Sequence, residues 1–169
     1  DPRHPKIVKV IEPAEIAEKT GYTRPHTIHC GPEGIYVAAL GSAEGKAPGG
    51  VFLMDPETFE PLGRWEIDRG PQKLSYDVWW HLGYDTMVTS EWGTPDTFEN
   101  GLIPEVLLGA KYGRRLHFWD LHARKHLQLF KRCSVSRAGG AGVAAAVAAR
   151  TGCAGADRLG SVKQAGRRS

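Results

Sequence analysis

Val51-Phe52-Leu53-Met54-Asp55 is an apolar segment that ends on an aspartate, and Leu116-His117-Phe118-Trp119-Asp120 repeats this form later in the chain. A polar turn and another strand-like segment follow each of them, so both predict β-hairpins. Two more strand-like segments precede each hairpin. They are residues 27–30 and 35–40 before the first hairpin, and residues 76–80 and 86–91 before the second. The chain therefore predicts two copies of a four-stranded unit.

Repeats of this kind, with four short strands each, are typical of propeller blades. The predicted fold is all-β, about two blades of a β-propeller with short helical insertions; a single small β-sandwich is the alternative. One helix is predicted over residues 14–19, which have Glu15 early, Lys19 late and Gly21 just beyond. A second is predicted over residues 103–110. Residues 6–11 alternate as in a strand, and residues 22–25 are expected to be a loop.

The composition changes abruptly near the C-terminal end. Residues 1–132 carry 16 Lys/Arg and 18 Asp/Glu, whereas residues 133–169 carry six and one and contain no aromatic side chain. We therefore expect residues 1–132 to form the partial propeller, and residues 133–169 to be an Ala/Gly/Arg-rich tail that is disordered or out of frame. Because the aromatic residues all lie in the mildly acidic part, no basic aromatic face for nucleic acid is predicted.

Cysteine content and hydropathy indicate the cellular setting. The three cysteines show no disulfide framework, which favours a reducing compartment and a cytoplasmic protein. A periplasmic location is the alternative if a missing N-terminal part carries a signal peptide. No apolar run approaches the roughly 20 residues that span a bilayer. The first residue is Asp1, not Met, so the sequence is expected to be a fragment.

The stretch Pro25-His26-Thr27-Ile28-His29-Cys30 holds three potential soft-metal ligands. Imidazole suits copper, zinc and iron, and thiolate suits copper(I) and zinc. In a regular strand, residues three apart face opposite sides, so both imidazoles reach one ion only if the chain turns near His26. The alternative is one ligand and one hydrogen-bonded histidine. Cys30 should point away from His29 and be buried as a small apolar residue.

Other candidates near the predicted inner strands are weaker. His81 ends the strand of residues 76–81 and is either a ligand or an edge histidine beside a turn. Asp77 and Glu91 either orient a ligand imidazole or cap a turn, and the second role is favoured. The histidines of the last hairpin are expected to be solvated; they are His117, His122 and His126.

The residues also resemble a known family, the selenium-binding proteins, whose members include methanethiol oxidases. The segments that carry the resemblance are Val10-Ile11-Glu12-Pro13, His26-Thr27-Ile28-His29-Cys30-Gly31, Gly49-Gly50-Val51-Phe52-Leu53-Met54-Asp55-Pro56-Glu57-Thr58-Phe59-Glu60, Tyr76-Asp77-Val78-Trp79-Trp80, Thr89-Ser90-Glu91-Trp92-Gly93 and Gly113-Arg114-Arg115-Leu116-His117-Phe118-Trp119-Asp120. Members of the family are several times longer and fold as β-propellers, so the chain resembles an internal piece.

The resemblance implies a copper-dependent oxidase that converts methanethiol and oxygen to formaldehyde, hydrogen sulfide and hydrogen peroxide. It also implies selenium binding in some members, a small thiol substrate, and the missing blades as structural partners. The copper ligands predicted within this chain are His26, His29 and His81. Two alternatives stay open: a selenium- or metal-binding module without turnover, and a lactonase-type hydrolase with calcium held by Glu91, Asp77 and Asn100.

Overall fold

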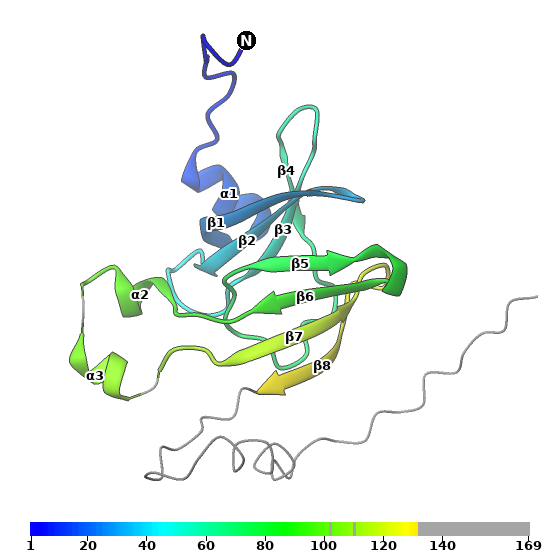
Figure 1. The fold of residues 1–169 in the computed structure, drawn as a ribbon. Coiled ribbons are helices and arrows are strands. Elements are labelled where there is room, and N and C mark those ends of the chain that lie inside the picture. The colour runs from blue at the N-terminus through cyan, green and yellow to red at the C-terminus, as the bar shows by residue number, and fades with distance from the viewer. Residues whose placement is uncertain (102, 110, 132–169) are drawn as a thin grey trace, which may run out of the picture. The chain divides into compact units, whose positions relative to one another are not determined.

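The computed structural model describes residues 1–101, 103–109 and 111–131, and these form two four-stranded antiparallel sheets with a few short helices (Figure 1). The all-β prediction is confirmed, and the two sheets are consistent with partial propeller blades. The prediction for residues 133–169 lies outside the described residues. The elements in chain order are α1 (Pro13–Thr20), β1 (Tyr22–Gly31), β2 (Gly34–Ser42), β3 (Gly50–Met54), β4 (Pro61–Arg64), β5 (Val78–His81), η1 (Leu82–Tyr84), β6 (Thr86–Ser90), α2 (Pro95–Phe98), α3 (Pro104–Leu108), β7 (Arg115–Asp120) and β8 (Lys125–Lys131).

The strand order within each sheet follows the chain, β1-β2-β3-β4 and then β5-β6-β7-β8, so the predicted repeat is present. Side chains alternate across each sheet, which sorts the first sheet into cross-strand rows. The row of His29, Tyr36 and Leu53 lies on one face, and the row of Ile28, Val37 and Phe52 lies on the other.

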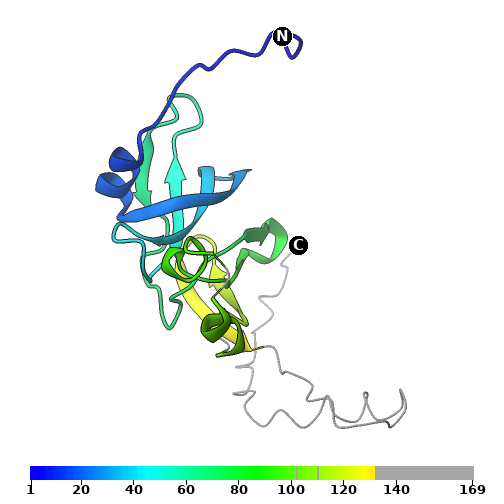
Figure 2. The same ribbon diagram turned by 90° about the vertical axis from the view of Figure 1, so that its left-hand side faces the viewer.

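The face of the first sheet that carries Tyr36 packs against the second sheet. The buried core cluster between them combines Tyr36, Ala38, Val51, Leu53 and Trp65 with Val78, Met87, Trp119 and Leu121. The rings of Trp65 and Trp119 meet edge to face at 5.7 Å. This packing places β1 beside the segment that enters β5, where Thr27 Oγ1 donates a hydrogen bond to the Tyr76 carbonyl at 3.4 Å. Figure 2 shows the two sheets from another side.

Helix α1 covers the opposite face of the first sheet. Ile16 of α1 packs on the cluster of Tyr22, Val37, Ala39 and Phe52. Pro13 opens the helix, and Gly21 ends it in the left-handed conformation at φ 71°, which favours glycine. The predicted helix and its caps are confirmed.

A buried polar network joins the first sheet to the loop that leads to the second. Glu66 accepts hydrogen bonds from the Tyr22 hydroxyl and from Arg69 Nη2, the latter at 2.7 Å. Burial raises the pKa of the Glu66 carboxyl, and it also raises the pKa of Tyr22. The guanidinium of Arg69 therefore supplies the charge that a buried carboxylate needs.

Three expectations about the elements are wrong. Residues 6–11 form no strand, and Ile7, Val8 and Val10 are exposed, because none of the described strands pairs with them. Residues 22–25 are not a loop but the first part of β1, paired with β2 from Tyr22 onward. The strand after the first tight turn, which the sequence predicts over residues 59–67, covers only Pro61–Arg64.

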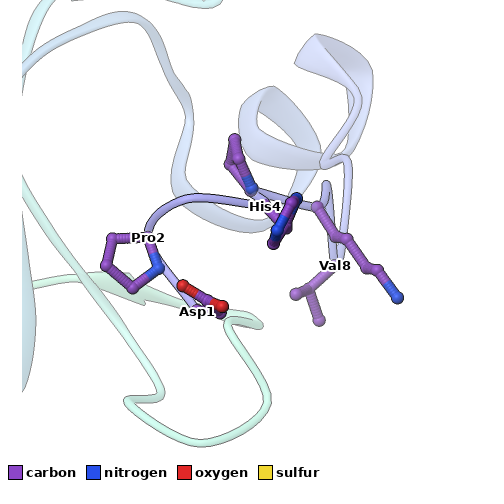
Figure 3. A pocket seen from close by; sticks show the side chains of 6 residues that line it. Asp1, Pro2, His4 and Val8 are labelled. Carbon is purple, nitrogen blue, oxygen red and sulfur yellow. The ribbon is translucent and has the colours of Figure 1, made fainter.

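The N-terminal segment forms an open hollow by itself, lined by Asp1, Pro2, His4, Pro5, Lys6 and Val8 (Figure 3). No residue of a sheet contributes to its lining, so it is not part of a site between elements. None of the described helices is long and apolar enough to cross a membrane.

Candidate functional site

Strand β1 carries His26 and His29 on the side that faces the start of β5. The β1–β2 pairing shifts between Pro25 and Thr27, where the partners are Ala39 and Ala38, so His26 is an extra residue in a β-bulge. A bulge changes the alternation of side chains along a strand. This is the chain turn that the sequence analysis required before two histidines three residues apart could face the same side.

The His29 ring is held by two residues from the start of the second sheet. Its ring meets the Trp80 ring edge to face at 5.7 Å. Its Nε2 atom lies 3.6 Å from Asp77 Oδ1, which is too long for a hydrogen bond. This nitrogen is buried and has no hydrogen-bond partner among the described residues.

The His26 ring stacks on Tyr76 with ring centroids 4.3 Å apart, and its Nδ1 lies 2.9 Å from Thr27 Oγ1. Tyr76 in turn meets Trp92 at 5.3 Å, within an aromatic cluster that also includes Phe98 and Tyr112. Both histidines therefore contact the same short segment, Tyr76 to Trp80, although His26 is exposed.

The structure does not bring His81 together with the other two histidines. His81 Nδ1 accepts a hydrogen bond from the Tyr84 backbone N–H at 3.2 Å, and so caps η1. Alternation along β5 places His81 on the opposite face from Trp80, the residue that contacts His29. The metal-binding role predicted for His81 remains a prediction. Its observed contacts are those of the alternative, an edge histidine beside a turn.

Cys30 is exposed, so the expectation that it is buried is wrong. It follows His29 on β1, where side chains alternate between faces, and it pairs with Ile35 at the edge of the sheet. Helix α1 covers the centre of that face and none of the described elements covers this edge position.

A buried histidine pair was missed by the sequence analysis. His117 is fully buried: its Nε2 lies 3.0 Å from Glu91 Oε1, and its Nδ1 lies 3.0 Å from His126 Nε2. Burial lowers the pKa of His126, neighbouring His117 lowers it further, and Asp68 opposes both. Solvation was therefore the wrong expectation for His117, whereas His126 is half-buried. His122, with its side chain 78% exposed, fits the expectation.

A signal for this pair was present in the sequence. His117 alternates with Trp119 along β7, so a buried Trp119 implies that His117 points into the same core. Glu91, which was expected to cap a turn, instead faces His117.

The described residues contain no group of three or more His, Cys, Asp or Glu side chains that could hold a metal ion. A metal ion binds histidine through a ring nitrogen that carries no proton. His29 Nε2 is buried and has no hydrogen-bond partner among the described residues, so this ring atom is free to bind a ligand. The calcium alternative gains no support, since Glu91 is bonded to His117, Asp77 faces His29 and Asn100 is exposed.

Comparison with known proteins yields one family. The sequence profile of the 56 kDa selenium-binding proteins matches residues 1–136. A methanethiol oxidase of Danio rerio is 38% identical over 129 residues, which cover 76% of this chain and 28% of the relative. A methanethiol oxidase of Homo sapiens is 36% identical over 76% of this chain and 27% of the relative.

A solved structure agrees with the sequence matches. The crystal structure of a hypothetical selenium-binding protein from Sulfolobus tokodaii is 53% identical, with a TM-score of 0.75, over 78% of this chain and 29% of that one. The chain thus spans under a third of the length of the relatives that it matches.

Proposed function

Because this chain belongs to the 56 kDa selenium-binding protein family, we propose that the full-length protein is a copper-dependent methanethiol oxidase. In this reaction methanethiol, oxygen and water give formaldehyde, hydrogen sulfide and hydrogen peroxide. The names of several relatives support the activity, among them the methanethiol oxidases of Danio rerio and Homo sapiens. The observation that carries the proposal is the buried His29 Nε2, for which the described part of the chain provides no hydrogen-bond partner.

Within this chain, His29 and His26 would hold copper, with further ligands from outside the described residues. Bound copper supplies one-electron chemistry between the sulfur of a thiol and oxygen. The edge contact of Trp80 fixes the His29 ring, and the stacking of Tyr76 restricts His26. Each aromatic ring also covers one side of the imidazole that it contacts.

The test uses the full-length protein that carries this sequence. His29→Ala should lower both the copper content and the thiol-dependent release of hydrogen peroxide. His122→Ala is the matched control, because His122 is exposed and should affect neither quantity. Undiminished copper and turnover in the His29→Ala protein would refute the assignment.

A second candidate is a selenium- or metal-binding protein without turnover. It is favoured by the family description and by a relative called selenium-binding protein 2 of Mus musculus, 37% identical over 76% of this chain. Copper-loaded protein that produces no peroxide from methanethiol, but retains its metal, would select this candidate.

A further inference from the structure

His29 and Asp77 face each other without a hydrogen bond. At 3.6 Å, Nε2 and Oδ1 are too far apart for a hydrogen bond, yet too close for an ordered water to lie between them. Two ligands that each lie about 2.0–2.1 Å from one ion, at about 90–120°, are separated by roughly 2.8–3.6 Å. The observed distance lies at the upper end of this range, so a small approach of the two side chains would let both bind one ion.

Asp77 is fixed in place by the second sheet. Its Oδ1 accepts a hydrogen bond from the Val78 backbone N–H at 2.7 Å. Its backbone carbonyl accepts a hydrogen bond from the Ser90 N–H at 3.0 Å, which joins the residue before β5 to the end of β6. Since Trp80 restricts the His29 ring from the same strand, both ligand atoms are positioned before an ion arrives.

We propose that Asp77 binds the same cation as His29, so that the metal site spans the first and second sheets. The proposal rests on the proposed function for the identity of the ion, copper. A carboxylate ligand also favours copper(II) over copper(I), because carboxylate oxygen is a hard donor. The oxidised ion should therefore be the form that this pair holds most tightly.

The chain contains a second histidine–aspartate pair that serves as a control. His122 Nε2 lies 3.4 Å from Asp85 Oδ1 near the β7–β8 turn. The His122 side chain is 78% exposed and is free to adopt other rotamers, so this pair lacks the positioning of His29 and Asp77. It should contribute nothing to copper binding.

The experiment titrates the full-length protein with Cu²⁺ alone, using a chromophoric chelator as competitor. Asp77→Asn keeps an oxygen acceptor for the Val78 N–H but removes the charge, and should weaken Cu²⁺ binding at least about 10-fold, as should His29→Gln. Because both ligands serve one ion, the double variant should lose less than the product of the two single losses. Asp85→Asn should bind Cu²⁺ like the unsubstituted protein.

Electron paramagnetic resonance gives a second readout that does not depend on turnover. Asp77→Asn and Asp77→Glu should each change the Cu²⁺ spectrum, because each alters an oxygen ligand; Asp77→Glu also retains the charge if Asp77→Asn proves unstable. Unchanged affinity and spectra in the Asp77 variants, with copper lost in His29→Gln, would overturn this inference alone. Unchanged binding in both Asp77→Asn and His29→Gln would overturn the copper assignment of the proposed function as well.

Discussion

At the scale of single residues, the chemistry of the chain depends on how buried polar atoms are paired. His117 has a partner on each ring nitrogen, Glu91 and His126, whereas His29 Nε2 has none among the described residues. If the Glu91 carboxylate accepts from His117, then His117 Nδ1 must accept from His126 Nε2. The pair is therefore a satisfied structural network, whereas His29 keeps a buried ring nitrogen with capacity for a ligand.

The histidine pair predicts a pH dependence of stability. Burial and His117 lower the pKa of His126, so near pH 6.5 the unfolded chain binds more protons than the folded one. The contribution of His126 to the free energy of unfolding should be complete above pH 6.5, and it should be lost as the pH falls below that value. Urea unfolding between pH 5.5 and 8 should show that the free energy of unfolding depends less steeply on pH in His126→Gln than in the wild type. Parallel pH curves for the two proteins would contradict this prediction.

The buried Glu66 carboxylate predicts a large loss of stability when its cationic partner, Arg69, is removed. Arg69→Ala leaves the Glu66 carboxylate buried without a charged partner and should lower the free energy of unfolding by about 3–5 kcal/mol. Lys19→Ala removes an exposed pair with Glu60 and should lower the free energy of unfolding far less, because water screens that pair. Chemical denaturation measures both, and equal effects would show that the Glu66 network is not a buried ion pair.

At the scale of elements, β3 can approach the Tyr22–Glu66 network because it begins with a glycine. A Cβ on Gly50 would lie 2.5 Å from Glu66 Oε1 and closer still to the Tyr22 hydroxyl. Gly50→Ala should therefore lower the free energy of unfolding by roughly 1–3 kcal/mol through overpacking. Gly83→Ala, which meets only the His81 side chain, is the control and should be almost neutral; a similar loss in both would contradict the packing argument.

Most of the sheet elements could be predicted because alternation and turn residues are local signals. The four-strand repeat, helix α1 and the hairpins are confirmed on this basis. Residues 6–11 show the limit of such signals, since a strand needs a partner, and none of the described strands pairs with them. A turn of the chain near His26 was stated as a requirement, but the β-bulge that provides it was not predicted, because register depends on the neighbouring strand.

The site was predictable only in part, because local signals identify candidate residues but do not show which of them meet. His29 and Asp77 were both identified as candidates, but their approach joins residues far apart in sequence. The buried His117 was missed because its carboxylate, Glu91, comes from another strand, although its alternation with Trp119 was visible. The ligand set of His26, His29 and His81 stays a prediction.

At the scale of the whole molecule, the second sheet has an apolar face that none of the described elements covers. Trp79, Val88 and Phe118 are cross-strand neighbours that line a shallow hollow on the side away from the first sheet. Strand β8 adds an exposed edge with Leu127 and Phe130. In relatives of which this chain covers only 28%, residues outside this chain are available to cover such surface.

This exposed surface predicts self-association of the 169-residue chain. Exposed apolar strand edges pair with other copies, so light scattering should rise with protein concentration. Phe130→Lys, at a position 58% exposed, should reduce the scattering. Ile7→Lys is the control, because Ile7 is exposed on a segment outside the sheets and should change little; an equal effect of both would contradict a role for the β8 edge.

The most direct test of the account is anomalous diffraction at the copper edge from crystals of the copper-loaded full-length protein. We expect an anomalous peak about 2 Å from His29 Nε2, on the side of Asp77. A peak bound by other residues, with His29 Nε2 still without a partner, would contradict the central claim that this nitrogen holds the metal.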